Sequence, residues 1–177
     1  RDGLWDVYRN LPMGACGDRS AERYRISRQE QDDYAIASFE RAISATARGA
    51  FKDEVVPVEA QAGRETVQVV ADENLGRFNP EKLRALRPAF GDDGTVTAGN
   101  ASSINDGAAA IMVMSGERMR EMGVRPQARV LGHATYAREP EWFTLAPVGA
   151  IAKLLGHLAL EAGDVDLYEI KIGRAHV

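Results

Sequence analysis

The sequence predicts an α/β fold, and three features of its hydrophobic pattern indicate it. Residues 108–115 form a continuous apolar run of strand length, which is typical of a strand buried on both faces of a sheet. Residues 147–162 repeat apolar side chains at helical spacing, and Gly163 ends that pattern. A second strand-like segment follows at residues 166–170, so strands and helices alternate as they do in α/β proteins.

The first part of the chain predicts a loop followed by a long helix. Residues 1–16 carry apolar anchors without a clean period, which indicates an ordered loop. Ser27 followed by Glu30 is a capping-box pattern, and the periodic segment after it predicts a helix of about 20 residues that ends near Gly49. We expect its charged residues to form a solvated face: Arg28, Glu30, Asp32, Asp33, Glu40 and Arg41.

Short elements follow this helix. Residues 54–59 and 66–70 read as two strands separated by a turn at residues 61–64. Residues 72–77 read as a polar loop, and Pro80 begins a short predicted helix that runs to Leu86.

Almost every residue from Gly94 to Ala110 is small. Such a stretch lets a ligand approach the backbone directly, with hydroxyl groups of serine and threonine beside it. The same composition also lets two elements pack closely. The residues by themselves therefore leave two interpretations open, a ligand-lining segment or a packing seam.

The last third of the chain predicts a second α/β unit. A polar helix is expected at residues 116–121, and residues 128–137 read as a strand after the boundary at Pro126. Residues 139–144 read as a loop that leads into the helix beginning at Pro147.

Composition excludes several classes of function. The 177 residues carry a net charge of −4, and the basic residues lie without interleaved aromatics, so a nucleic-acid binder is not expected. No apolar run reaches the roughly 20 residues of a membrane-spanning helix. The first residues resemble neither a signal peptide nor a natural start, so we expect the chain to begin within a longer protein. A single cysteine favours a reducing, cytoplasmic setting.

Candidate reactive groups are few. Cys16 has no histidine near it in the sequence, and an activated thiolate needs a cationic or helix-terminal neighbour, so a structural cysteine is expected. His133 lies in a predicted strand and His157 on a predicted helix, and both read as packing or surface residues. Asp92 and Asp93 read as turn residues rather than as an acid/base pair. No Cys/His spacing predicts a metal site.

Several motifs in the correct order resemble the thiolase family, specifically its acetyl-CoA acetyltransferase branch. The small-residue stretch is similar to the family segment GTVTAGNASxxNDGAAA, and residues 27–38 resemble SRxEQDxYAxxS. Residues 51–58 resemble FKDEIVPV, and residues 82–90 resemble KLxxLRPAF. The resemblance covers residues 1–170 and implies a thiolase-like α/β fold. In that fold, residues 1–104 would form most of the coenzyme-A-binding loop domain, residues 105–125 the end of the first core domain, and residues 126–170 the start of the second.

The resemblance also implies which residues contact a coenzyme A thioester. Leu4 and Met13 would line the pantetheine tunnel, Arg77 would contact the adenine and phosphate end, and Phe143 would project toward the acyl pocket. The full set of implied binding residues is Leu4, Met13, Arg77, Leu86, Ala89, Phe90, Ala98, Ser102, Ile104 and Phe143. Some members bind potassium near Ala98 with the help of a tyrosine. This chain has Leu75 at the position of that tyrosine, so no metal is expected. Coenzyme A thioesters are the implied substrates, so no separate cofactor is expected.

The implied reaction is the condensation of two acetyl-CoA molecules to acetoacetyl-CoA and coenzyme A, or the reverse thiolysis, through an acetyl-cysteine intermediate. The family's nucleophilic cysteine, its Gly-His-Pro histidine and its second cysteine have no counterpart here, so this chain is expected to be an inactive fragment of a homodimeric or homotetrameric enzyme. Residues 171–177 depart from the family and can be encoded by a common sequencing adapter, so we interpret them as adapter read-through.

Three other interpretations stay open at this point. The complete protein could be a degradative 3-ketoacyl-CoA thiolase, or a non-catalytic acyl-CoA-binding protein with a thiolase-like body. A phosphate-binding loop around residues 91–99 is the third, although no Gly-Lys-Ser/Thr follows it.

Overall fold

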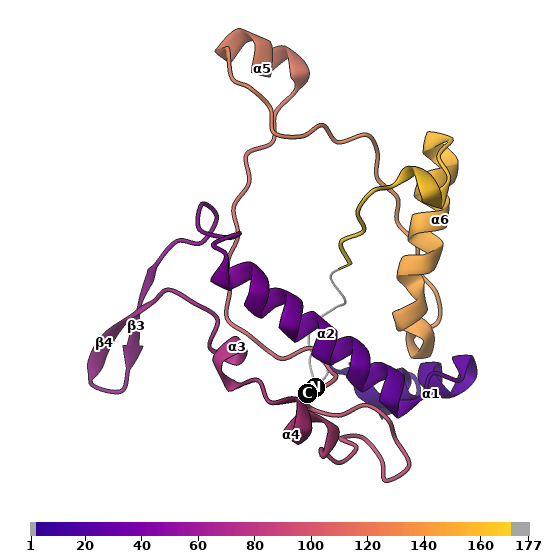
Figure 1. Ribbon diagram of the computed structural model, residues 1–177. Helices are drawn as coiled ribbons and strands as arrows, with labels where there is room; N and C mark the ends of the chain where they lie inside the picture. The colour runs from indigo at the N-terminus through magenta and orange to yellow at the C-terminus, as the bar shows by residue number, and fades with distance from the viewer. Residues whose placement is uncertain (1–2, 171–177) are drawn as a thin grey trace. The chain divides into compact units, whose positions relative to one another are not determined.

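The computed structural model describes residues 3–170, which divide into two compact units (Figure 1). One unit contains residues 21–102, and the other contains residues 3–20 and 103–170. The interpretation of residues 171–177 as adapter read-through lies outside the described residues. None of the helices described between residues 3 and 170 combines the length and apolar character that crossing a membrane requires.

The unit of residues 21–102 is built on helix α2 (Arg28–Ala47), as the capping pattern predicted. The Ser27 hydroxyl accepts a hydrogen bond from the Glu30 N–H at 3.2 Å, and the Glu30 carboxylate accepts one from the Ser27 N–H at 2.8 Å. This reciprocal pair satisfies two N–H groups at the helix start. The helix ends before Gly49, whose φ of +71° suits a residue without a Cβ.

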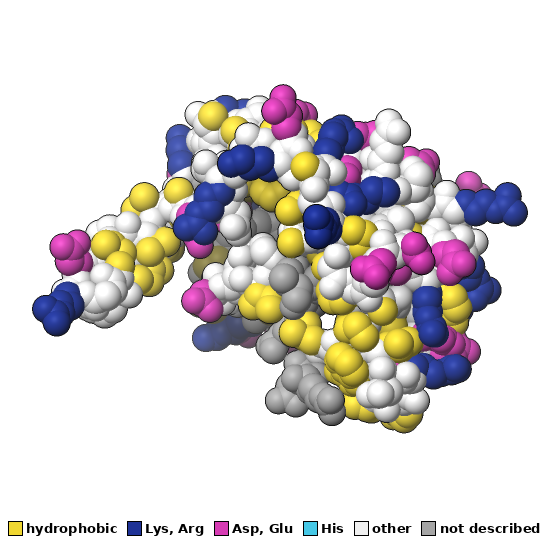
Figure 2. Space-filling view, turned by 90° about the horizontal axis from the view of Figure 1, so that it is seen from below, with side chains coloured by type: hydrophobic (Ala, Val, Ile, Leu, Met, Phe, Trp, Pro, Cys, Tyr) yellow, Lys and Arg dark blue, Asp and Glu magenta, His cyan; other side chains and the backbone are white. Residues whose placement is uncertain are grey.

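Strands β3 (Val58–Ala62) and β4 (Glu65–Val69) form an antiparallel hairpin. Gly63 and Arg64 make a two-residue turn, and Gly63 has the positive φ of +68° that such a turn needs. The hairpin confirms two predicted strands, but the first begins at Val58, because residues 51–54 form a turn instead. The valines of this hairpin are exposed, and Figure 2 shows hydrophobic side chains along it, at the left of the view.

Two short helices follow the hairpin. Helix α3 (Glu73–Arg77) replaces the polar loop expected there, because the Asp72 carboxylate accepts the N–H of Asn74 at 2.9 Å and so starts a helical turn. Helix α4 (Pro80–Arg84) confirms the prediction from Pro80, with the Asn79 side chain accepting the Lys82 N–H at 2.8 Å.

Aromatic stacking holds the end of α3 against α2. The rings of Phe39 and Phe78 stack with centroids 4.7 Å apart.

The other unit begins with a short ribbon and a helix where the sequence predicted a loop. Strands β1 (Trp5–Asp6) and β2 (Leu11–Pro12) pair in antiparallel fashion, and helix α1 (Met13–Tyr24), which belongs to this unit as far as Ser20, follows directly. The loop prediction at residues 1–16 was therefore wrong for residues 13–16, where Gly14 and the short side chains of Ala15 and Cys16 hide the helical period. Cys16 and Ser20 lie on the buried face of α1.

The regular elements described in the rest of this unit are helices. Helix α5 (Gly116–Met122) confirms the predicted polar helix, and the 3-10 helix η1 (Pro140–Leu145) leads into α6 (Ala146–Leu158). A further 3-10 helix, η2 (Ala162–Asp164), follows. Helix α6 ends at Ala159, whose left-handed φ of 52° breaks the helix before the predicted end at residue 162.

Close contacts hold the segment before η1 along α6. A Cβ on Gly149 would lie 2.5 Å from the Tyr136 ring, and a Cβ on Gly132 would lie 3.2 Å from Leu158. Both glycines therefore permit an approach that a larger residue would prevent.

The three strands predicted at residues 108–115, 128–137 and 166–170 are not formed. A strand requires a neighbour that pairs with its backbone N–H and C=O groups, and among the described residues only β1 with β2 and β3 with β4 pair in this way. Residues 108–115 instead form no regular secondary structure, and Ile111 is 88% exposed. An apolar run of strand length is thus present without the sheet that would cover it.

Candidate functional site

The centre of the unit of residues 21–102 is an ion pair within α2. Arg28 Nε donates to both carboxylate oxygens of Asp32, at 3.0 and 2.9 Å. The Asp32 residue is only 3% exposed. The expectation of a solvated charged face was therefore wrong for these two residues, because neighbouring segments cover the pair and supply further hydrogen-bond partners.

Arg28 also fixes the chain after α4. Its Nη2 donates to the carbonyl oxygens of Arg84 at 3.2 Å and Leu86 at 3.0 Å. These carbonyls lie at the C-terminal end of the helix, where no N–H of the helix satisfies them. One guanidinium thus joins the start of α2 to the end of α4 and sets the backbone position of Leu86.

Asn100 connects Asp32 to the small-residue stretch. Its Nδ2 donates to Asp32 at 3.0 Å and to the Thr95 carbonyl at 3.0 Å, while its Oδ1 accepts the Thr97 N–H at 2.8 Å. Gln31 Nε2 donates to the Thr95 hydroxyl at 2.9 Å. We call Arg28, Asp32 and Asn100 the anchor triad, and it holds residues 95–100 on α2.

Close packing reinforces this attachment. Thr97 is fully buried, and a Cβ on Gly99 would lie 2.8 Å from both Leu83 Cγ and Leu86 Cδ1. This part of the small-residue stretch is therefore a packing seam against α4. Residues 102–110 are exposed, so the second part of the stretch is open to solvent in the described structure. Of the two interpretations that the residues left open, the seam holds for the first part.

Six of the ten residues implied by the resemblance lie in this unit. Arg77 ends α3 and is exposed, and Leu86 is 38% exposed beside the anchor triad. The Ala89 N–H donates to the Val96 carbonyl at 2.9 Å, which brings the segment of Ala89 and Phe90 beside the anchored stretch. The remaining members of this group are Ala98 and Ser102, both exposed.

The other four lie in the second unit. The Met13 N–H donates to the Leu4 carbonyl at 3.0 Å, so these two residues are neighbours, and both are half-buried. Phe143 lies in η1 and is also half-buried, whereas Ile104 is 66% exposed. The structure thus brings Leu4 together with Met13, and Leu86 together with the loop of Ala89, Phe90 and Ala98.

Within residues 3–170, the side chains that could act as a nucleophile or a base at neutral pH are Cys16, His133 and His157. Cys16 is fully buried, and burial raises the pKa of its thiol, with the Asp6 carboxylate acting in the same direction. A thiol of this kind is a poor nucleophile at neutral pH. His133 lies in an extended segment rather than the predicted strand, and His157 lies on α6 as predicted. Within residues 3–170, no cluster of three His, Cys, Asp or Glu residues is placed to hold a metal ion.

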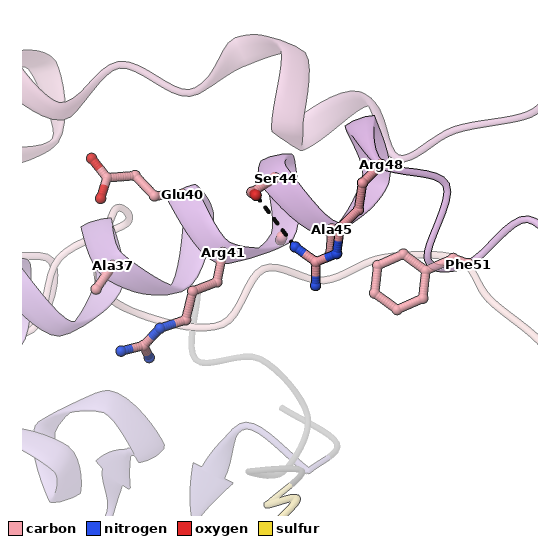
Figure 3. A pocket seen from close by; sticks show the side chains of 8 residues that line it. Ala37, Glu40, Arg41, Ser44, Ala45, Arg48 and Phe51 are labelled. Atoms are coloured by element: carbon pink, nitrogen blue, oxygen red, sulfur yellow. Dashed lines mark hydrogen bonds between the residues drawn. The ribbon is translucent and has the colours of Figure 1, made fainter.

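A shallow hollow of about 690 Å³ runs along the second half of α2 (Figure 3). Its lining includes Glu40, Arg41, Ser44, Arg48 and Phe51. Arg48 Nη1 donates to the Ser44 hydroxyl at 3.3 Å, so part of the polar lining is paired within the helix. The hollow includes none of the residues implied by the resemblance, and no buried charge faces it.

The sequence pattern around Arg28, Asp32 and Asn100 did not predict that these residues form the anchor triad. The one local signal was the i, i+4 spacing of Arg28 and Asp32, which is equally common on solvated helix faces. Asn100 follows Asp32 by 68 residues, so no pattern within the helix could have predicted their contact.

Comparison with known proteins places this arrangement in a family. Residues 1–117 match the profile described as "Thiolase, N-terminal domain". Acetyl-CoA acetyltransferase 2 from Arabidopsis thaliana is 51% identical over 173 residues, which are 96% of this chain and 43% of that protein. The chain therefore spans less than half the length of this relative.

Solved structures agree with the sequence match. The crystal structure of the Bacillus anthracis acetyl-CoA acetyltransferase gives a TM-score of 0.88 at 38% identity, covering 93% of this chain and 42% of that one. The Acat5 thiolase from Ascaris suum, solved in complex with coenzyme A, gives a TM-score of 0.83 at 41% identity, covering 94% and 43%. These similarities also confirm the predicted thiolase-like α/β fold. The match of residues 1–117 to the thiolase profile, together with these similarities in sequence and structure, identifies the chain as a member of the thiolase family.

Proposed function

We propose that this chain is part of an acetyl-CoA C-acetyltransferase and contributes binding surface for a coenzyme A thioester. The observation that carries the proposal is the 51% identity to an acetyl-CoA acetyltransferase across 96% of the chain. The complete enzyme would condense two acetyl-CoA molecules or cleave acetoacetyl-CoA through an acetyl-cysteine intermediate. Its predicted homodimeric or homotetrameric state and its cytoplasmic location stay predictions.

The anchor triad supports a binding role for residues 86–102. A flexible carrier such as the pantetheine arm binds more tightly to a surface that is already ordered, because less conformational entropy is lost. Arg28 and Asn100 fix the backbone on both sides of Ala89 and Phe90. In this proposal, residues 1–104 belong to the loop domain, residues 105–125 end the first core domain, and residues 126–170 begin the second.

The reacting groups are proposed to come from elsewhere in the enzyme. Cys16 is the single cysteine of the sequence, and its buried thiol has a raised pKa. An activated thiolate requires the opposite environment, with cationic neighbours and a lowered pKa. The chain alone is therefore expected to show no thiolysis of acetoacetyl-CoA.

A chimera tests the proposal. Residues 3–170 would replace the matching segment of the Arabidopsis thaliana acetyl-CoA acetyltransferase 2, and thiolysis would be followed by loss of acetoacetyl-CoA absorbance. We expect an active chimera in which Arg77→Ala raises the KM for coenzyme A several-fold, because a guanidinium that pairs with phosphate is lost. Arg64→Ala, in the hairpin turn of the same unit, is the matched control and should leave the KM unchanged.

Two outcomes would count against the proposal. A folded chimera without activity would show that this segment does not supply a compatible binding surface. A preference for long 3-ketoacyl-CoA substrates over acetoacetyl-CoA would instead favour the degradative type of thiolase.

A further inference from the structure

The 3-10 helix η1 is fastened to the first residues of its unit by an ion-pair cluster. Glu141 Oε1 lies 3.2 Å from Arg9 Nη2, and Glu141 Oε2 accepts a hydrogen bond from Arg19 Nη1 at 2.9 Å. The Glu141 side chain is 14% exposed, although the two arginine side chains are 59% and 44% exposed. A carboxylate that is largely withdrawn from water and paired through both oxygens is better ordered than an ordinary surface ion pair.

A hydroxyl pair makes the second attachment. Ser20 Oγ donates to the Cys16 carbonyl at 3.1 Å, and it lies 2.7 Å from Thr144 Oγ1. A serine hydroxyl has a single proton, so when Ser20 donates it to the Cys16 carbonyl, Thr144 is the donor in the second bond. Ser20 is only 7% exposed, so loss of this bond would leave a buried hydroxyl oxygen without its donor.

The residues that make these two attachments flank Phe143 in the sequence. Glu141 precedes it by two residues and Thr144 follows it directly, and Trp142 between them departs from helical geometry with φ −111° and ψ 21°. Phe143 directly follows the kink at Trp142, and an attached residue lies on each side of these two, Glu141 before and Thr144 after. Fixing both neighbours limits the directions that the Phe143 side chain can take. Phe143 therefore occupies a position set by Arg19 and Ser20 of α1.

The helix to which η1 is attached also carries Met13. Helix α1, which carries Arg19 and Ser20, begins at Met13, and the Met13 N–H donates to the Leu4 carbonyl at 3.0 Å. Asp6 Oδ1 accepts the N–H groups of Tyr8 at 3.0 Å and Arg9 at 3.4 Å, which orders the turn that carries Arg9.

We propose that Glu141 and Thr144 are positioning residues that hold Phe143 of η1 at a fixed place on α1, the helix that begins at Met13, and thereby set the acyl length that the enzyme accepts. This inference rests on the proposed function, since it needs a thioester whose pantetheine arm passes Leu4 and Met13. A rigid aromatic side chain at the end of an acyl pocket excludes additional methylene groups, and a mobile one admits them.

Substrate selectivity in the chimera is the first test. The ratio of kcat/KM for acetoacetyl-CoA to that for 3-ketohexanoyl-CoA would be measured for Glu141→Gln, Thr144→Val and the control Glu139→Gln. Glu139 belongs to the same segment but is exposed, with Arg138 3.7 Å away. We expect the ratio to fall by about threefold or more in the first two variants, through a lower KM for the longer substrate, and to stay unchanged in the control.

A double-mutant cycle separates positioning from general damage to the fold. Glu141→Gln removes the ion pairs with both Arg9 and Arg19, and Arg19→Met removes the second of these alone, so the double variant should shift the ratio by no more than Glu141→Gln does by itself. Additive shifts, or equal loss of activity on both substrates at unchanged ratio, would overturn the inference while leaving the proposed function intact.

Hydrogen exchange of the 177-residue chain, outside the chimera, supplies a readout that does not depend on activity. Peptides covering residues 140–146 should exchange faster in Glu141→Gln than in Glu139→Gln, because only the first loses the attachment to α1. Equal protection in both variants would show that the cluster does not hold η1, whether or not the chimera is active.

Discussion

Replacing Asn100 with alanine removes the link between α2 and the small-residue stretch. The change deletes hydrogen bonds to the Asp32 carboxylate, the Thr95 carbonyl and the Thr97 N–H. Thr97 is fully buried and Asp32 is 3% exposed, so water cannot readily replace the lost partner.

The expected loss follows from these bonds. Each neutral hydrogen bond contributes about 1 kcal/mol, and the bond to the charged carboxylate contributes about 1.5–3 kcal/mol. Because Asn100 is only half-buried, we take the lower values and expect the free energy of unfolding of this unit to fall by about 3 kcal/mol. Asn79→Ala is the matched control, because it removes a single N-cap bond in the same unit and should cost about 1 kcal/mol.

Urea unfolding followed by circular dichroism at 222 nm would measure both variants, since α2 is the longest described helix. Trp5 and Trp142, the two tryptophans of the sequence, lie in the unit of residues 3–20 and 103–170. Their fluorescence should therefore keep its unfolding midpoint in both variants. The reasoning fails if Asn100→Ala costs no more than Asn79→Ala, or if the fluorescence midpoint shifts as far as the dichroism.

Three further results are expected. Gly99→Ala should destabilise the unit of residues 21–102 by about 1–3 kcal/mol in the same assay, because its Cβ would overlap Leu83, whereas Gly107→Ala meets nothing within 4 Å and should be neutral. Cys16 should react with a disulfide reagent at pH 8 at least about tenfold more slowly in the native chain than in urea, and equal rates would contradict its burial and raised pKa. Hydrogen bonds from the Ser27 backbone and hydroxyl lower the pKa of Glu30. The contribution of Glu30 to stability is therefore present above the unfolded pKa of 4.5 and is lost as the pH falls through the lower folded pKa. Glu30→Ala should make the circular dichroism signal of the helix less sensitive to pH in that range.

The sequence by itself determined the elements that depend on neighbouring residues. The capping box of Ser27 and Glu30, the helix after Asn79 and Pro80, the turn at Gly63 and the polar helix after Ser115 all form as expected. Each relies on contacts between residues at most a few positions apart, so its signal lies within a short segment. The ordered set of motifs likewise determined the family.

Tertiary structure decided which polar residues are buried. Asp32 has the pattern of a solvated helix residue, yet Asn100, 68 positions later, covers and pairs it. Glu141 lies in a predicted loop, yet it pairs with Arg19 across 122 positions. The apolar run at residues 108–115 shows the reverse case, because a strand forms only when another strand pairs with it. Local pattern describes what a segment can become, and contacts between distant segments decide which of those forms it takes.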